Sequence, residues 1–527
     1  MRQALHIFAK DARHFWMEIS ISLVVTALFA WLYPNMWIPR INRGGGMNLQ
    51  TLATIAMGLV LASWWILITR VVQEENLVGD QQWWITKPYE WPQLLGAKAL
   101  FVLAFVAAPL ICAQGAMVVE AGFRPWHYLP GMGFDLLLIA GVVVLPLLAM
   151  AAVTSSFGRM TLLAFGVLLA LVAYIALMAF TQTNRFSAPI AHHAPAVLTL
   201  LLAGGAMVVQ YARRRVWRAR LVLMALLLIP FALGFVFAAP SLIAGAYPGE
   251  GRLPLRIDVD PSRAMTAVPS WLPGREKMVE LMVPITTSGL TTEDVVNLEG
   301  EQVTVQSADG RQWSSVWETM FGAHLRPNST DTTVDLEISR DFLEQAKAQP
   351  VELRVRFAAT ELKKAGEAEV AMAAHDFGVP EFGVCAPVPD FAQPAFTGIT
   401  CRAPLRQPML TYITVRWSDG PCTASGTGAP DGVSGAGWVG SPSSDLAEFS
   451  LASVWSSPIG LSNSIIDYVG SGKPRRDPRR FLCPGTPMTF TRYAVVRRTQ
   501  YSMTLTGVHI PAWQTPVEGG TAYTVGD

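Results

Sequence analysis

The stretch QTLATIAMGLVLASWWILIT (residues 50–69) is followed by VVQEENLVGDQQWWITKPYEWPQLLG (71–96) and then by AKALFVLAFVAAPLICAQGAMV (97–118). The first and third runs are apolar over about 20 residues, which is the length that a helix needs to cross a bilayer. The middle run is polar and rich in large aromatic side chains. The sequence therefore predicts two membrane-spanning helices joined by a substantial polar loop.

The composition of the whole chain also indicates a membrane protein. Hydrophobic residues make up 51% of its 527 residues and charged residues only 15%, whereas soluble domains usually carry about 25% charged residues. The net charge of +1 gives no reason to expect nucleic acid as a partner. Seven apolar stretches predict an α-helical transmembrane domain over residues 1–246, with spans near 15–33, 50–69, 97–118, 133–154, 160–181, 194–211 and 221–246.

Basic residues in short loops predict the orientation of these spans, because they accumulate on the cytoplasmic side. The opposite side receives few of them before residue 247, and an odd number of spans would place the rest of the chain outside. The loop 71–97 is then cytoplasmic, in a plasma (inner) membrane protein. If 221–246 were instead re-entrant, the C-terminal half would be cytoplasmic. The cytoplasmic set is Arg2, Lys10, Arg13, Arg70, Lys87, Lys98, Arg159, Arg213, Arg214, Arg215, Arg218 and Arg220, against Arg40, Arg43, Arg124 and Arg185 on the other side.

The C-terminal half is expected to be β-rich. Residues 250–365 contain short runs of alternating apolar and polar residues, typical of antiparallel strands in a sandwich. Asp309-Gly310 predicts a hairpin turn, and Ser339 is a suitable N-cap for a short helix over 340–348. A second part, residues 378–527, is rich in Gly and Pro and contains four cysteines.

Those four cysteines provide a separate indication of compartment. An even number in one extracytoplasmic part fits disulfides formed in an oxidising environment. The alternatives are unpaired thiols or a different pairing, since four cysteines allow three pairings. The short loop between the first two favours one arrangement, Cys385–Cys401 with Cys422–Cys483.

Catalytic, metal and nucleotide signals are absent from the sequence. There is no His-Glu-x-x-His pattern and no Gly-x-Ser-x-Gly elbow. Gly472-Lys473 superficially resembles a phosphate loop, but Asp467 stands where the first glycine is required. We therefore expect no catalytic residue, no metal site and no cofactor bound by this chain. Glu18, near the cytoplasmic end of the first span, is expected either to reach the interface or to line a pathway.

The loop that opened this section has an ordered pattern of residue types. Acidic residues come first, then a glycine, a Trp-x-Thr-Lys-Pro turn, and a Gly-x-Lys that leads into the next span. This order resembles the corresponding loop of ABC-2 type transporter permeases, and Ile7–Trp16 is similar to the interfacial helix at the start of that family. The matching positions are Glu74, Glu75, Gly79, Trp84, Thr86, Lys87, Pro88, Gly96 and Lys98.

The resemblance covers about residues 1–220 and implies a transporter subunit without its own ATPase. A separate ABC-type ATPase subunit would use ATP and dock on loop 71–97, and a second permease copy or a paralogue would complete the pathway. The resemblance favours export as the direction of transport. Trp83, Trp84 and Tyr89 would then be interface anchors, although an interfacial aromatic belt is the simpler alternative. A different hypothesis is a membrane-anchored sensor or assembly protein whose outer domain binds a partner.

Overall fold

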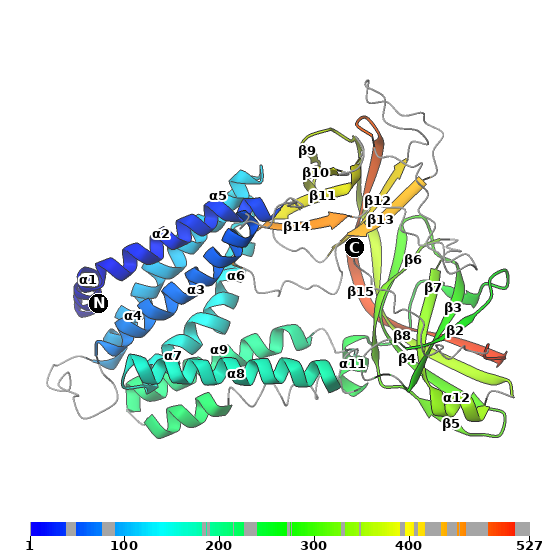
Figure 1. Cartoon of the computed structure of the whole chain (residues 1–527), viewed down its shortest axis with the longest axis horizontal. Coiled ribbons are helices and arrows are strands. Elements are labelled where there is room, and N and C mark those ends of the chain that lie inside the picture. Colours follow the sequence, from blue (N-terminus) through cyan, green and yellow to red (C-terminus); the bar gives the residue numbers. More distant parts are fainter. Residues whose placement is uncertain are drawn as a thin grey trace, which may run out of the picture. The chain divides into compact units, whose positions relative to one another are not determined.

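We describe the chain from a computed structural model (Figure 1). The description that follows covers residues 2–37, 49–75, 90–181, 186, 190–213, 216–225, 240–270, 275, 277–327, 332–346, 349–389, 396–404, 409–416, 434–439, 451–452, 454–459 and 483–511.

An N-terminal helical part precedes a β-rich part made of antiparallel sheets, as the composition predicts. The helices are long where the sequence is continuously apolar, and short helical turns lie at loop corners. In chain order they are α1 (Arg2–His14), α2 (Trp16–Leu32), η1 (Tyr33–Met36), α3 (Leu49–Gln73), α4 (Trp91–Val102), η3 (Leu103–Ala107), α5 (Ala108–Glu120), η4 (Pro125–His127), α6 (Leu129–Ile139), η5 (Ala140–Val144), α7 (Leu145–Val153), α8 (Phe157–Thr181), α9 (Ile190–Arg213) and α11 (Pro240–Ala246).

Three helical stretches within the described residues are long and apolar enough to cross a membrane: Thr51–Gln73, Trp91–Glu120 and Leu129–Val153. A fourth is possible if α1 and α2, which meet at an angle of 77°, form one broken span. Helices α8 and α9 lie at the predicted fifth and sixth spans, with shorter apolar parts at Phe157–Ala170 and Val197–Arg213. Much of the predicted seventh span, 221–246, lies outside the described residues.

Two of the spans contain a proline, and the helix adapts to each in the same way. The π-helical turns η3 and η5 end just before Pro109 and Pro146. A proline removes one backbone donor and its ring crowds the preceding turn. A wider turn relieves this crowding while the helix continues. Trp91–Glu120 consequently remains a single helical rod.

The described strands pair antiparallel, and contacts between residues divide the chain into two compact units. Unit 1 comprises residues 1–170, 192–231 and 365–492, and unit 2 comprises 171–191, 232–364 and 493–527. The strands are β1 (Arg256–Val259), β2 (Thr266–Pro269), β3 (Met278–Ser288), β4 (Asp294–Ser307), β5 (Gln312–Ser314), β6 (Glu318–Leu325), β7 (Thr332–Ser339), β8 (Val351–Ala371), β9 (Phe377–Val379), β10 (Gly383–Pro389), β11 (Phe396–Pro404), β12 (Met409–Arg416), β13 (Ser434–Val439), β14 (Val454–Ile459) and β15 (Pro487–Val508).

The division into parts 250–365 and 378–527 stays a prediction, because the two units are compact groups of contacts and include segments from different parts of the chain. The long strands β8 and β15 contribute residues to both units, and the end of the chain after residue 492 groups with 232–364. Sequence patterns locate individual strands but not the partner that a late strand returns to, because strand pairing is set by long-range packing.

Two sheets of unit 2 share one apolar core. Strand β3 pairs with β1, β2 and β7 in one sheet, while β4 pairs with β5, β6 and β8 in the other. Alternate residues of β3 and β4, such as Leu281 and Val303, are buried in the same cluster. The predicted turn at Gly310 joins β4 to β5 with a φ of 86°. The predicted helix is α12 (Arg340–Ala346), and the Ser339 hydroxyl accepts a hydrogen bond from the Phe342 amide at 3.5 Å.

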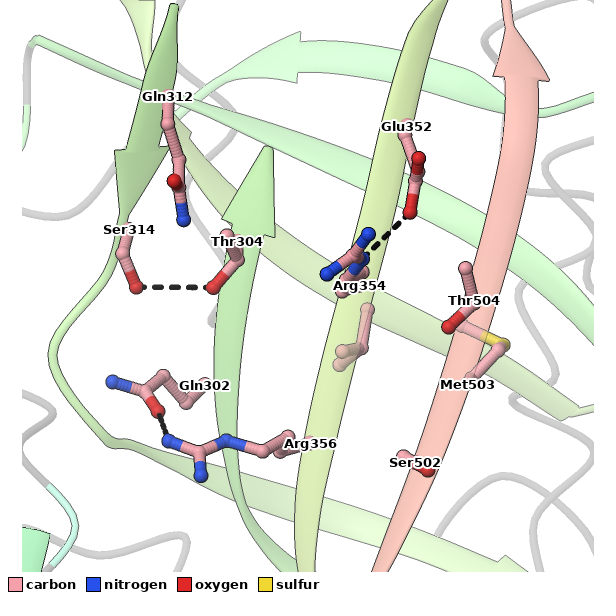
Figure 2. A pocket seen from close by; sticks show the side chains of 11 residues that line it. Gln302, Thr304, Gln312, Ser314, Glu352, Arg354, Arg356, Ser502, Met503 and Thr504 are labelled. Carbon is pink, nitrogen blue, oxygen red and sulfur yellow. Dashed lines mark hydrogen bonds and ion pairs between the residues drawn. The ribbon is translucent and has the colours of Figure 1, made fainter. Parts of the chain in front are cut away.

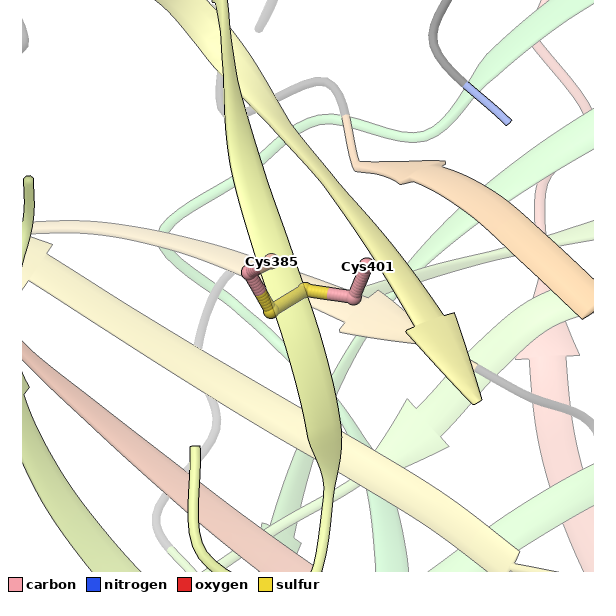
Figure 3. The surroundings of a disulfide bond; sticks show 2 residues. All are labelled: Cys385 and Cys401. Carbon is pink, nitrogen blue, oxygen red and sulfur yellow. A yellow bond between two sulfur atoms is a disulfide. The ribbon is translucent and has the colours of Figure 1, made fainter. Parts of the chain in front are cut away.

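The cysteine-containing part of unit 1 forms a four-stranded sheet in the order β14-β11-β10-β9. Cys385 of β10 and Cys401 of β11 lie directly opposite each other, with Cα atoms 4.0 Å apart, and form a disulfide (Figure 3). This is the pairing that the short loop favours. Cys483 is also disulfide-bonded, and Cys422 lies outside the described residues.

A group of carboxylates lies at one end of the unit 2 core. Glu301 of β4 pairs across the ladder with Glu318 of β6, and both side chains are buried. Arg275 donates to Glu318 at 2.8 Å and also contacts Glu337. Burial, together with the nearby charges of Glu318, Asp335 and Glu280, raises the pKa of Glu301 well above its ordinary value. Glu301 is therefore protonated in the folded chain at pH values where it would ionise when unfolded.

The raised pKa makes the stability of unit 2 depend on pH. The folded state binds the Glu301 proton more tightly than the unfolded state, so the free energy of unfolding falls as pH rises from about 4.5 towards the folded pKa. We expect Glu301→Gln to reduce this fall and to raise the melting temperature at pH 8 more than at pH 5. The effect is measured by thermal unfolding of the purified full chain across this pH range and, separately, by hydrogen exchange in β4. Parallel pH profiles for the two proteins would contradict the assignment.

Candidate functional site

The first helix presents one apolar face to α4. Ile7 and Asp11, one helical turn apart, are its buried residues. The Phe8 ring stacks on Phe105 with ring centres 5.8 Å apart and meets the edge of Phe101 at 6.4 Å. Aromatic pairs of this kind add to the burial of apolar area. They hold α1 along the start of the rod Trp91–Glu120, and they place the Asp11 carboxylate inside the packing.

A buried ion cluster lies where α1, the end of α3 and the start of α4 meet. The Lys98 ammonium, on a side chain only 1% exposed, donates to the Asp11 carboxylate at 2.8 Å and contacts Glu75. It also donates to the Val71 carbonyl at 2.8 Å. Lys10 donates to Glu75 at 2.8 Å from the solvent side and lies 3.2 Å from Asp11. Two ammonium groups thus balance two carboxylates, which we call the Lys98 cluster.

The electrostatics of the cluster favour the charged forms of Glu75 and Lys10. Burial alone would raise the pKa of Glu75, but the Lys98 charge and the hydrogen bonds from Lys10 and Lys98 outweigh burial and lower it. Burial likewise opposes the charged form of Lys10, yet the hydrogen bond and charge of Glu75 raise its pKa. Each charge is therefore stabilised by its neighbours. Removal of one charge leaves the opposite charges buried without a partner, which costs free energy of folding.

Two further ion pairs lie beside the cluster. Glu74 is more exposed than Glu75 and its carboxylate is 3.8 Å from His14 at the end of α1. Glu18, at the start of α2, is 3.5 Å from Arg70 at the end of α3. This contact places Glu18 at the same end of the helices as the Lys98 cluster. Together with the Lys98 cluster, these contacts join α1, α2, the end of α3 and α4.

The structure brings together two of the residues singled out in the loop between the second and third predicted spans, Glu75 and Lys98. Glu74 lies outside the cluster. Gly96 is exposed, and a Cβ atom added there would meet no described atom within 4 Å. Gly79, Trp84, Thr86, Lys87 and Pro88 lie outside the described residues.

Sequence reasoning missed the contributions of α1 to this site. Asp11 and Lys10 were not among the candidate residues, although both contact Glu75 or Lys98. A signal was present, because Asp11 shares a helix face with Ile7 at a spacing of four residues. A carboxylate on the apolar face of an amphipathic helix requires a buried cation as its partner.

A second candidate site is a polar groove on one sheet face in unit 2 (Figure 2). It has a volume of about 590 Å³. The Arg356 guanidinium lies over the Trp317 ring at 5.6 Å and donates to Gln302, while Arg354 pairs with Glu352 at 2.6 Å. Its lining residues, on β4, β5, β8 and β15, are Gln302, Thr304, Gln312, Ser314, Glu352, Arg354, Val355, Arg356, Ser502, Met503 and Thr504.

Within the part of the chain that the structure describes, no group of three or more His, Cys, Asp or Glu side chains has the geometry of a metal site. The described site residues therefore offer ion pairing and hydrogen bonding. In the Lys98 cluster these interactions join α1, the end of α3 and α4.

Comparisons with known proteins give little further guidance. No family model matches the chain, and no curated protein matches it. Among solved structures, the C-terminal globular domain of an oligosaccharyltransferase from Pyrococcus abyssi is similar over 48% of this chain and 50% of that chain, at 11% identity and a TM-score of 0.12. The match thus spans about half of that domain, and a TM-score this low carries no argument about fold or function.

The Lys98 cluster predicts a large loss of stability when its central cation is removed. Lys98→Met leaves Asp11 and Glu75 buried with only Lys10 to compensate, which should cost about 3–5 kcal/mol. A thermal unfolding measurement on the purified full chain tests this. Lys363→Met is the matched control, because Lys363 and Glu293 are 3.6 Å apart and both well exposed, so little change is expected. Equal shifts for the two variants would show that the cluster contributes no special stability.

Proposed function

We propose that this chain is the membrane-spanning permease subunit of an ATP-driven, ABC-type transporter, and that it works as an exporter with a separate ATPase. The observation that carries the proposal is the Lys98 cluster. It connects Glu75, within the loop 71–97, and Lys98, directly after it, to each other and to α1. A loop whose ends are joined by buried charges has a firm base from which a partner can move the helices.

The mechanism we propose starts with an ATPase bound to the loop. Closing of that ATPase on ATP displaces the loop, and the displacement reaches the end of α3 through Glu75 and the start of α4 through Lys98. Because Lys98 also contacts Asp11, α1 moves with them. This chain contributes positioning and transmission, while ATP hydrolysis belongs to the partner.

The proposed topology has seven spans, an internal N-terminus and an extracytoplasmic C-terminal domain in the plasma (inner) membrane. The cysteine disulfide supports an oxidising location for the β-rich part. Contacts of the loop between α8 and α9 add support. The Phe186 amide donates to the Trp317 carbonyl at 3.0 Å, and a Cβ atom added at Gly300 would overlap the Phe186 ring. Phe186, expected outside, therefore contacts the β-rich structure of unit 2.

A second permease copy or a paralogue completes the proposed assembly, as the family resemblance implies. One helical core of this type supplies half of a pathway. The spans carry few charges, which favours an amphiphilic or lipid-like cargo over a small ion.

Gly96 offers a direct test of ATPase docking that spares the fold. A larger side chain there meets no described neighbour, so Gly96→Leu should leave thermal stability unchanged. If an ATPase covers the start of α4, the same variant should weaken co-purification with an ABC-type ATPase encoded beside this chain and reduce its stimulated hydrolysis by about tenfold or more. Trp84→Ala and Glu75→Lys should act in the same direction.

Gly205→Leu is the matched control, since that glycine lies in α9 and also has no described atom within reach of an added Cβ. Stimulation equal to wild type in all three loop variants, with the ATPase still bound, would exclude coupling through this loop.

A second candidate function is a membrane-anchored sensor or assembly protein whose outer domain binds a partner. The polar groove favours it. Trp317 and Gln302 hold Arg356 in a fixed orientation while its guanidinium stays exposed. An arginine oriented in this way suits a carboxylate or phosphate group, and neighbouring hydroxyl and amide groups would contact the rest of a polar ligand.

This alternative predicts binding of an acidic ligand to the groove. Labelled polyglutamate should bind the full chain with an affinity that falls as salt increases, and Arg356→Ala should reduce the affinity about tenfold. Arg340→Ala is the control, because Arg340 forms an exposed pair with Glu344 on α12, away from the groove lining. Equal affinity in both variants, measured by fluorescence anisotropy, would leave the groove without a role in acid recognition.

A further inference from the structure

One continuous helical rod joins the Lys98 cluster to the disulfide-containing sheet. The apolar stretch Trp91–Glu120 extends over 30 residues without a break. Lys98 lies near its first end, inside the ion cluster. Glu120 is its last residue, and the turn that follows contains Gly122 and Phe123. A helix of this length spans about 45 Å at the usual rise per residue.

The far end of the rod packs tightly against β10. A Cβ atom built on Gly122, whose φ is 88°, would lie 3.4 Å from the Val384 side chain. A Cβ atom on Gly383, whose φ is 138°, would overlap the Arg402 carbonyl oxygen and lie 3.3 Å from the Phe123 ring. Both positions have a backbone conformation that glycine alone adopts readily. The close approach of the turn to the sheet therefore depends on these two glycines.

Arg402 of β11 makes a second connection at the same place. Its side chain is buried and forms an ion pair with Asp376. Its guanidinium also lies 5.7 Å from the ring centre of Trp37, the buried residue that follows η1. Glu120 at the end of the rod interacts favourably with the same charge. Arg402 thus contacts the end of the rod, Trp37 and its own sheet. Displacement of any one of these would break an interaction of a buried charge, which is costly.

The apolar packing is continuous along this junction. Gln114, fully buried in α5, donates to the Leu451 carbonyl at 3.5 Å. Leu451 and Ala452, which precede β14, belong to the same buried cluster as the membrane helices. The rod and the sheet are consequently held together by apolar contacts, by the close approach of the backbone at the two glycines, and by a buried charge.

We infer that the rod Trp91–Glu120 transmits movement from the Lys98 cluster to the sheet β14-β11-β10-β9, so that the outer sheet is a driven element. The proposed ATPase supplies the movement, and to that extent the inference rests on the proposed function. Displacement of α4 shifts the turn Gly122–Phe123 and, with it, β10 and β11. The disulfide between Cys385 and Cys401 makes those two strands respond together. The work of ATP hydrolysis then reaches a surface outside the bilayer, where it can reposition a bound partner or cargo.

Hydrogen exchange of the full chain in nanodiscs tests the connection in two arms. In the first, the ATPase partner is present and the nucleotide state is switched between none and ATP with vanadate. Peptides from residues 383–404 should change exchange rate by about fivefold or more. Arg402→Gln should abolish that change while ATPase stimulation is retained. Arg354→Gln, an exposed arginine on β8, is the matched control and should leave the response intact.

The second arm needs no ATPase. Lys98→Arg and Lys98→Met alter the cluster to different degrees, and each should change exchange in 383–404, the more conservative variant less. Lys363→Met should not. If the rod couples the two sites, hydrogen exchange differs between the Lys98 variants and the wild type in a sheet that Lys98 does not contact.

The outcomes separate the two proposals. If the wild-type chain neither bound nor stimulated an ATPase, the proposed function would be overturned. The second arm would still test whether the rod connects the Lys98 cluster to the sheet. Normal stimulation with unchanged exchange in 383–404, or a response that survives in Arg402→Gln, would overturn the inference alone. Unchanged exchange after both Lys98 substitutions would overturn it as well.

Discussion

The buried ammonium of Lys98 is the constraint on which the rest of the helical part depends. A charge in an apolar interior is stable only where opposite charges and hydrogen-bond acceptors meet it. Asp11, Glu75 and the Val71 carbonyl satisfy that requirement from α1 and from the end of α3. Three segments distant in sequence therefore have to meet at one point. The aromatic contacts of Phe8 with Phe101 and Phe105 complete the packing around it.

A comparable constraint operates where the rod Trp91–Glu120 ends. There, backbone conformations available to Gly122 and Gly383 permit an approach that other residues would block, and the buried Arg402 is shared between Asp376 and Trp37. Charge pairing at one end of the helix and close backbone approach at the other leave the span little freedom to move alone. The π turn before Pro109 keeps it continuous in between. This arrangement supports our proposal that movement at one end of the span reaches the sheet at the other.

Unit 2 has a different character. Its two sheets bury alternate residues in a common core, while the exposed face of β4, β5, β8 and β15 carries hydroxyl, amide and guanidinium groups in a groove. Glu301 is an unfavourable element of this core. Its carboxyl is buried beside other acids, and burial raises its pKa and favours the protonated form. A polar groove over an apolar core suits recognition of a polar partner, which is compatible with either proposed function.

Composition and hydropathy alone determined the helical first half, the β-rich second half and the positions of the first four apolar helices. The reason is that the pattern of apolar and polar residues is a local property of the sequence. The turn at Asp309-Gly310, the cap at Ser339 and the Cys385–Cys401 pairing were likewise readable, since each depends on neighbouring residues or a short loop. The motif in residues 74–98 indicated Glu75 and Lys98, but not that they touch each other. Only the tertiary structure added Asp11 and Lys10 to the site, joined β15 to an earlier part of the chain, and brought Gly122 against Val384. Contacts between residues far apart in sequence follow from packing and from the pairing of buried charges, and no periodicity along the chain records which partner each will meet.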